Sequence, residues 1–186
     1  MEKYLLKNST FPIEMIKILI KNVAIKRFKK GTILLSKGEK SNECYLVLKG
    51  CIRSFVIKNT EEITIEFYTE EQSVSPVNYG KEIPSELYLE CVEETVVAIG
   101  TPEKEAEMYK LFPELKLNNL ELTEEMLNNN NSAFINYKIA SAEERYLKLI
   151  KEKPDLIQRV PQYHLASYLG IKPESLSRIR RRISKK

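Results

Sequence analysis

Basic side chains are concentrated in the last fifteen residues of this 186-residue chain. From Lys172 to Lys186, seven Lys and Arg residues stand against Glu174 alone, a net charge of +6, whereas the whole chain has +4. Arginine can form paired hydrogen bonds with guanine or phosphate, and lysine binds phosphate as a point charge. The positive charge therefore lies where a nucleic acid could be bound.

The residues that lead into this basic segment have the spacing of a helix-turn-helix. Counting from Gln162, an alanine is fifth, a glycine is ninth, and an apolar pair is fifteenth and eighteenth. Two crossing helices need a small side chain where they approach, and a tight turn needs a residue that tolerates positive φ; Ala166 and Gly170 supply these. The predicted inner faces are Leu165, Ala166 and Leu169 in the first helix, and Leu176, Ile179 and Ile183 in the second.

The second helix of this motif would turn a polar and basic face outward. On such a face arginine can bond guanine, glutamate can accept from the cytosine amino group, and serine or lysine near the helix start can hold phosphates. A basic helix end can also be a solvated face that complements the helix dipole, but the Ala-Gly-apolar spacing favours sequence-specific DNA binding. The predicted DNA-binding residues are Gln162, Lys172, Glu174, Ser175, Ser177, Arg178, Arg181 and Arg182.

Histidine and cysteine, which serve much of metal and nucleophile chemistry, are scarce in this chain. There is one histidine, His164, and the three cysteines Cys44, Cys51 and Cys91 have no CxxC spacing. A cupin-type metal enzyme needs clustered histidines with a carboxylate, and Ser/His or Cys/His catalysis needs His164 beside a nucleophile of another module. We therefore expect no enzyme activity, no metal site, no cofactor, buried reduced thiols, and a surface or phosphate contact for His164.

The composition is that of a folded chain, with 42% hydrophobic and 30% charged residues. Its length suits a sensor of about 120 residues joined to a small helical module. No apolar run approaches the roughly 18 residues of a membrane helix, and the first residues carry charge rather than the apolar region of a signal peptide. We expect a cytoplasmic protein without a membrane partner.

The part of the chain before the motif changes from helical to strand spacing. Residues 11–26 place apolar side chains near helical spacing and predict a short helix. From Phe28 to Ile99, short segments rich in Val, Ile, Tyr and Phe alternate with turn residues, as in an antiparallel sandwich or barrel. The predicted strands are Thr32–Ser36, Cys44–Leu48, Cys51–Ile57, Ile63–Tyr68, Leu87–Cys91 and Thr95–Ile99.

A long helix is predicted after the strands, beginning at Pro113. Leu120, Leu127 and Phe134 lie seven residues apart in it, a spacing typical of a helix that packs along another helix. This stripe predicts a dimer interface, although it could instead lie on the chain's own β domain. The four asparagines of 128–131 would weaken the helix by roughly 0.5 kcal/mol each relative to alanine, so a break there is possible.

A further helix is predicted at 141–153, after the long helix, because Ser141 and Glu144 have the spacing of a capping box. The predicted fold class is α+β, with an antiparallel, jelly-roll-like β-roll sensor at 1–112, a dimerisation helix at 113–138 and a helix-turn-helix domain at 139–186.

Two stretches of this chain resemble the Crp/Fnr family of bacterial transcription regulators. The first stretch is similar to the start of the family's cyclic-nucleotide-binding β-roll, which is interrupted by glycines. It consists of Phe28–Leu34, Gly38 and Tyr45-Leu46-Val47-Leu48-Lys49-Gly50. The second stretch is Leu165–Arg182. The resemblance covers essentially the whole chain. It implies a homodimer on double-stranded DNA, with recognition helices in successive major grooves, and RNA polymerase and a small-molecule effector as further partners.

The resemblance also implies roles for single positions. Glu174 and Arg178 fall at the family's base-reading positions, and Pro173 replaces a common arginine before them. The family's cyclic-nucleotide binders carry a cassette with Gly-Glu and, later in the sequence, Arg-Ser or Arg-Thr. The corresponding stretch of this chain is Ser75–Glu86, which has Pro76-Val77 in place of Gly-Glu and Pro84-Ser85 in place of the arginine pair. Because a buried cyclic phosphate without its arginine would lack a charged partner, we expect no response to cAMP or cGMP. The cysteine spacing and the place of His164 also argue against cluster or haem sensing.

An alternative function is a small-molecule-binding β-roll with a basic tail that binds nucleic acid nonspecifically. A specific regulator would bind one duplex far more tightly than random duplex at the same salt, whereas a basic tail would show only steep salt dependence.

Overall fold

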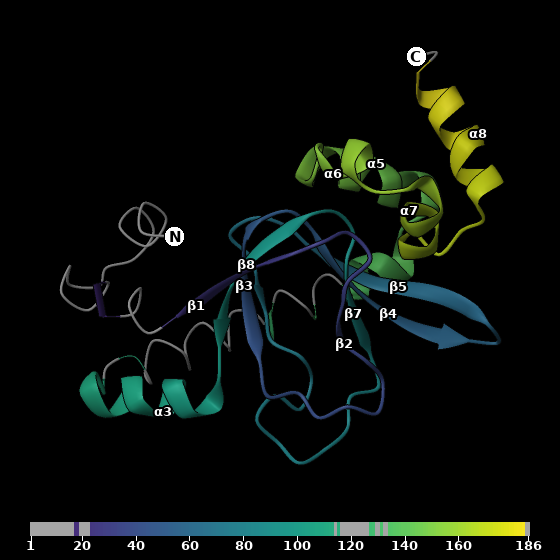
Figure 1. The fold of residues 1–186 in the computed structure, drawn as a ribbon. Helices are drawn as coiled ribbons and strands as arrows, with labels where there is room; N and C mark the ends of the chain where they lie inside the picture. Colours follow the sequence, from purple (N-terminus) through teal and green to yellow (C-terminus); the bar gives the residue numbers. More distant parts are fainter. Residues whose placement is uncertain are drawn as a thin grey trace. The chain divides into compact units, whose positions relative to one another are not determined.

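The fold was analysed in a computed structural model, which describes residues 17–18, 23–113, 115, 127–128, 131 and 134–184 (Figure 1). They form two compact units, one from the described residues of 1–54 and 67–119, and one from those of 55–66 and 120–186. A β-roll followed by helices confirms the predicted fold class. None of the helices in the described ranges has the length and apolar character needed to cross a bilayer.

Two four-stranded sheets form the β-roll, in the orders β1-β8-β3-β6 and β2-β7-β4-β5 (Figure 1). The strands are β1 Ala24–Phe28, β2 Ile33–Leu35, β3 Cys44–Lys49, β4 Ile52–Lys58, β5 Glu61–Tyr68, β6 Ser73–Val74, β7 Tyr88–Cys91 and β8 Thr95–Gly100. Alternate residues of strands from both sheets point inward, as the two-residue period of a strand requires. The core consists of Leu35, Tyr45, Val47, Ile52, Val74, Leu89, Cys91, Val97 and Ile99.

The six predicted strands are confirmed to within a residue or two, and β1 and β6 were not predicted. The helix predicted for residues 11–26 is wrong at its C-terminal end, because Ala24–Phe28 is a strand paired antiparallel with β8. A ladder of backbone hydrogen bonds to β8 outweighs the helical spacing of a few apolar side chains there. Lys17 and Ile18 are helical, and the rest of residues 1–22 lies outside the described residues.

The three cysteines are free thiols in this fold. Cys51 and Cys91 are buried, as predicted, whereas Cys44 is only half-buried. Burial raises the pKa of the Cys91 thiol to about 11, so this group is protonated and unreactive at neutral pH.

Helical structure follows β8. Helix α3, Pro102–Leu111, begins after Thr101, whose side chain caps the backbone N–H of Lys104, and it was not separately predicted. Of the helix predicted at 113–138, residues 115, 127, 128, 131 and 134–138 are helical, as is Ile139, while Leu120 lies outside the described residues. The exposed apolar side chains among the described residues of 127–139 include Leu127, Phe134, Ile135 and Ile139.

The second unit contains α5 Ala142–Glu152, α6 Leu156–Arg159, α7 Gln162–Tyr168 and α8 Pro173–Ile183. The capping box that begins α5 is confirmed: Ser141 N–H donates to the Glu144 carboxylate at 2.7 Å, and Glu144 N–H donates to Ser141 Oγ at 3.3 Å. These hydrogen bonds favour the ionised carboxylate and lower the pKa of Glu144. The unit also includes the outer end of the β4–β5 hairpin, where Ser167 Oγ of α7 donates to Glu62 C=O at 2.9 Å.

The turn between α7 and α8 has the hydrogen bonds of a Schellman motif. Ile171 N–H donates to Ala166 C=O and Gly170 N–H donates to Ser167 C=O, both at 3.0 Å. Gly170 has φ +67°, as the sequence predicted for this position. A β-carbon there would also come within 2.5 Å of Tyr137 Oη. The backbone conformation therefore favours glycine at this turn, and any β-carbon there would have to displace the Tyr137 hydroxyl.

Replacing Gly170 should destabilise the helix-turn-helix. Gly170→Ala is expected to cost about 1–2 kcal/mol, because alanine is strained in the left-handed region. Gly170→Asn is the matched control, since asparagine tolerates this region better but carries the same β-carbon. Chemical denaturation of the full chain should therefore rank the wild type first, Asn second and Ala last; equal losses of stability would assign the cost to the contact with Tyr137 instead.

Candidate nucleic-acid interface

Helix α8 has one buried and one exposed face. Leu176 is fully buried, Ile179 is buried and Ile183 is half-buried, and they face the helical core with the buried Leu165, Ala166 and Leu169 of α7. This confirms both predicted inner faces. The opposite face of α8 exposes Glu174, Ser177, Arg178, Arg181 and Arg182, while Ser175 is half-buried.

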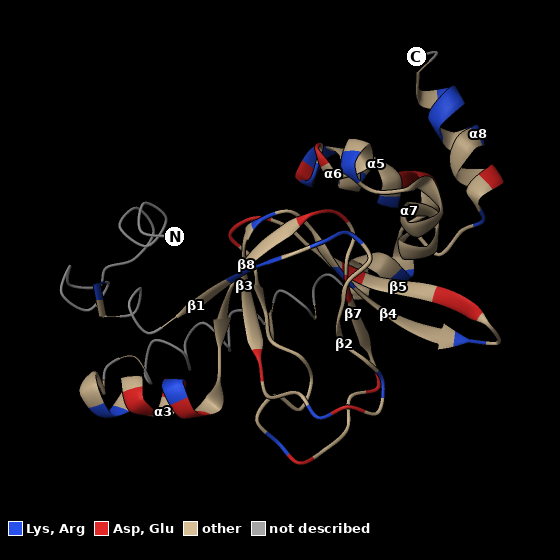
Figure 2. Cartoon of the chain, viewed as in Figure 1, with Lys and Arg blue, Asp and Glu red and all other residues tan. Residues whose placement is uncertain are grey.

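Charge changes sign along α8. Figure 2 shows acidic colour at the start of the helix, where Glu174 lies, and basic colour in its second half. Arg180, Arg181 and Arg182 occupy the last turn. Lys172 precedes the helix as its N-cap residue and is exposed, as is Gln162 at the start of α7. All predicted DNA-binding residues except Ser175 are therefore well exposed.

Arg182 has an ion-pair partner on another helix. Its Nη2 lies 2.5 Å from Oε2 of Glu143 in α5, with 59% of the Arg182 side chain exposed. A pair this accessible to solvent contributes little, about 0–1 kcal/mol, so a phosphate oxygen could replace the carboxylate. Glu143 was not considered in the sequence analysis, because no spacing rule connects residues so far apart in the chain.

His164 is buried, so the predicted surface or phosphate contact is wrong. It lies in the first turn of α7, on the inner side with Leu165 and Ala166. The exposed neighbour is Tyr163, at 60%, whose hydroxyl can donate to a phosphate. Tyr163 was not among the predicted DNA-binding residues, although it follows the exposed Gln162 and precedes the buried residues of α7.

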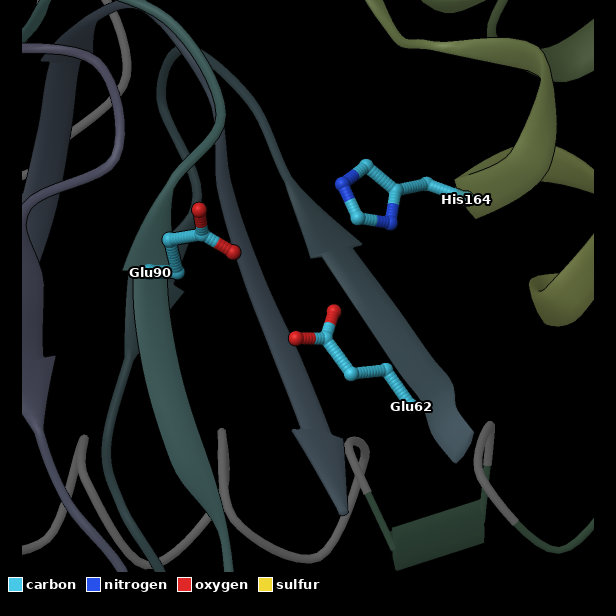
Figure 3. Close-up of side chains that lie close together, drawn as sticks. All are labelled: Glu62, Glu90 and His164. Atoms are coloured by element: carbon cyan, nitrogen blue, oxygen red, sulfur yellow. The ribbon is translucent and has the colours of Figure 1, made fainter. Parts of the chain in front are cut away.

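Among the described residues of its unit, His164 lies near one further candidate metal ligand, Glu62. Figure 3 shows the side chains of Glu62, Glu90 and His164. Glu62 and His164 belong to the second unit, whereas Glu90 belongs to the first, where its Oε2 lies 2.5 Å from Nη2 of the buried Arg53. One histidine and one carboxylate are too few ligands for a protein metal site. We therefore assign no metal to these residues.

The loop at the family's cassette position, residues 75–86, differs from a phosphate-binding site. Its one cation, Lys81, is exposed. Ser85 is buried, and its hydroxyl donates to Leu87 C=O at 2.9 Å and accepts from Leu87 N–H at 3.1 Å. The hydroxyl thus stabilises the loop itself. Arg53, which is buried in the roll, is already neutralised by Glu90.

Comparisons with known proteins agree with this architecture. Residues 25–104 match the model of the cyclic nucleotide-binding domain family. No curated protein matches the chain in sequence.

Solved structures match at low identity but over most of the chain. FixK2 from Bradyrhizobium japonicum has a TM-score of 0.72 at 15% identity, over 88% of this chain and 85% of that protein. A CooA mutant from Carboxydothermus hydrogenoformans has a TM-score of 0.69 at 16% identity, over 98% and 83%. The c-di-GMP-responsive global regulator CLP from Xanthomonas campestris also has 0.69 at 16% identity, over 94% and 92%. At such identities the likeness shows the fold. Residues 25–104 are thus similar to cyclic nucleotide-binding domains, and the chain resembles the Crp/Fnr regulators both in this domain and in its fold.

Proposed function

We propose that this chain is a sequence-specific DNA-binding transcription regulator of the Crp/Fnr type, and not an enzyme. The observation that carries the proposal is the division of α8 into a buried apolar face and an exposed face with Glu174, Ser177 and Arg178. A helix held this way, after a left-handed glycine turn, can enter the major groove, which is about 12 Å wide. Similarity in fold to CLP, a global regulator linked to virulence gene expression, supports a regulatory function.

In this proposal, base reading and phosphate binding fall on different residues. Arg178 donates to O6 and N7 of guanine, and Glu174 accepts from the amino group of cytosine. Phosphates are bound by Gln162, Lys172, Arg181 and Arg182, and Tyr163 adds a hydroxyl beside Gln162. Ser175 and Ser177 lie between these groups; the Ser177 hydroxyl also donates to Pro173 C=O at 3.1 Å, leaving its lone pairs for a base or phosphate donor.

The proposed dimer rests on the apolar surface of the long helix. Leu127 is 58% exposed and Phe134 is 62% exposed, and Ile135 and Ile139 are exposed beside them. Large apolar side chains exposed on one helical stretch support an interaction surface there. A two-fold dimer also supplies the paired recognition helices that two half-sites about 34 Å apart require.

The β-roll is proposed as a sensor that does not respond to cAMP or cGMP. Its cassette loop has one exposed lysine, and its buried arginine, Arg53, is paired with Glu90. A cyclic phosphate would therefore lose water without gaining a bidentate cation. The resemblance also predicts an effector for the roll and a contact with RNA polymerase, and the sequence predicts a cytoplasmic location. These three points stay predictions.

Two arginine variants test the DNA readout. Arg178→Ala should weaken binding to the preferred duplex by about 1–3 kcal/mol and relax sequence choice at one position per half-site. Arg182→Ala should instead weaken all duplexes alike and reduce the salt slope by about one unit for each phosphate that the variant no longer binds. The preferred duplex comes from selection on the wild-type protein, and both variants are titrated on it and on random duplex at several salt concentrations. Equal weakening on both duplexes for both variants would favour the nonspecific basic tail.

Charge placed in the proposed dimer seam should separate the subunits. Leu127→Glu with Phe134→Glu is expected to give a monomer by light scattering, because like charges would face each other across the two-fold axis. The control variant, Asn128→Glu with Asn136→Glu, adds the same charge to exposed polar positions of the same helical stretch and should remain dimeric. A wild-type protein that is monomeric with and without DNA would contradict the proposal.

Calorimetry with millimolar cAMP and cGMP should give no saturable heat. The physical reason is the missing arginine of the cassette, and the positive control is a cyclic-nucleotide-binding regulator measured in the same buffer. A clear one-site isotherm would show that another group binds the phosphate, and Lys81→Ala would then identify or exclude the exposed lysine.

A further inference from the structure

One arginine of the second unit connects three backbone segments. Arg145, in α5, donates through Nη1 to the carbonyls of Tyr137 at 3.2 Å and Ala140 at 2.9 Å, and through Nη2 to the carbonyl of Leu169 at 3.0 Å. Tyr137 and Ala140 lie at the end of the helical segment 134–139, and Leu169 is the C-cap of α7. The side chain thus joins the end of the helical segment 134–139 to the turn of the helix-turn-helix.

Tyr137 adds a second contact between the same two places. The guanidinium carbon of Arg145 lies 4.5 Å from the centroid of its ring, a cation–π geometry. The Tyr137 hydroxyl occupies the space that a β-carbon on Gly170 would need. We refer to Arg145, Tyr137 and the carbonyls that Arg145 binds as the clasp.

A basic side chain near a helix end commonly satisfies the last carbonyls of its own helix. Arg145 does more than this. It lies in the following helix, it binds carbonyls of two other segments, and it does so with the fork of donors that only arginine has.

The clasp depends on polar contacts more than on close packing. Tyr137, Ala140, Arg145 and Leu169 all line a cavity of about 240 Å³. The side chain of Tyr137 is exposed on its other side. The apolar side chains that hold α5, α7 and α8 together lie beside the clasp and include the buried Tyr146, Leu149, Leu165, Leu169, Leu176 and Ile179; of these, Leu149 and Leu169 also line the cavity. Opening the clasp should therefore change the hinge and leave the three helices folded.

We propose that Arg145, with Tyr137, is a positioning residue that sets the angle between the long helix and the helix-turn-helix, and so the distance between recognition helices in the dimer. This inference rests on the proposed function. An 11-residue helix such as α8 is about 16 Å long, so a hinge rotation of about 10° moves its far end by roughly 3 Å. That displacement is close to the rise of about 3.4 Å per base pair. Without the clasp, the preference for one half-site spacing should therefore relax.

The test compares Arg145→Lys with the wild type in two measurements on the full chain. Lysine keeps the charge but cannot bind three carbonyls and stack on the ring. Without DNA, hydrogen exchange at the Ala140 and Gly170 amides should speed up by about tenfold or more, while amides within α8 keep their protection. On DNA, the affinity of the wild type should fall by about tenfold or more when one base pair is inserted or deleted between half-sites, whereas Arg145→Lys should bind all three duplexes within about threefold.

Matched variants separate the clasp from charge and from folding. Lys151→Ala removes a cation from an exposed position of the same helix and should behave as the wild type in both measurements. Tyr137→Phe keeps the ring and should also keep the spacing preference, while Tyr137→Leu should relax it. If Arg145→Lys fails to fold, hydrogen exchange and DNA binding are measured on Tyr137→Leu instead.

Each outcome decides the inference. Unchanged exchange in both Arg145→Lys and Tyr137→Leu would overturn the clasp itself. Faster exchange with an unchanged spacing preference would overturn the positioning role. If the wild type bound no duplex specifically, the proposed function would fail and the spacing role with it, and the exchange data would still show separately whether the clasp holds the hinge.

Discussion

The turn at Gly170 is the constraint on which the exposed face of α8 depends. A left-handed residue with two Schellman hydrogen bonds ends α7 and redirects the chain within a few residues. The crossing that results allows Leu176 and Ile179 to be buried with Ala166, whose small side chain permits close approach. Burial of these residues in turn decides which residues of α8 face solvent. In the proposed function, Arg178 and Glu174 can reach base edges only because this turn fixes the exposed face of α8.

Charge alone would not make the C-terminal segment specific. A run of arginines attracts any phosphate backbone, and that attraction carries no sequence information. Specificity needs a rigid helix whose register is set by packing, so that one side chain meets one base edge. The Arg182–Glu143 ion pair illustrates the other role of charge here, because it connects α8 to α5 on the surface while leaving Arg178 exposed.

The β-roll combines the architecture of a cyclic-nucleotide-binding domain with different chemistry in the cassette loop. Apolar side chains from both sheets fill its core. Its buried arginine is paired with a glutamate, and the serine of its cassette loop is bonded to its own backbone. A fold is retained by apolar packing and turn geometry, whereas a ligand depends on a few polar groups, so the two can change independently.

The sequence by itself determined the features that depend on local periodicity and on single residue types. Six strands, the capping box at Ser141, the glycine turn and both inner faces of the helix-turn-helix follow from spacing that is visible along the chain. Tertiary structure decided what depends on distant partners. Pairing with β8 made Ala24–Phe28 a strand, tertiary contacts buried His164, and chain folding brought Arg182 to Glu143 and Arg145 to Leu169. No local pattern encodes such contacts, because their free energy arises only when segments far apart in sequence meet.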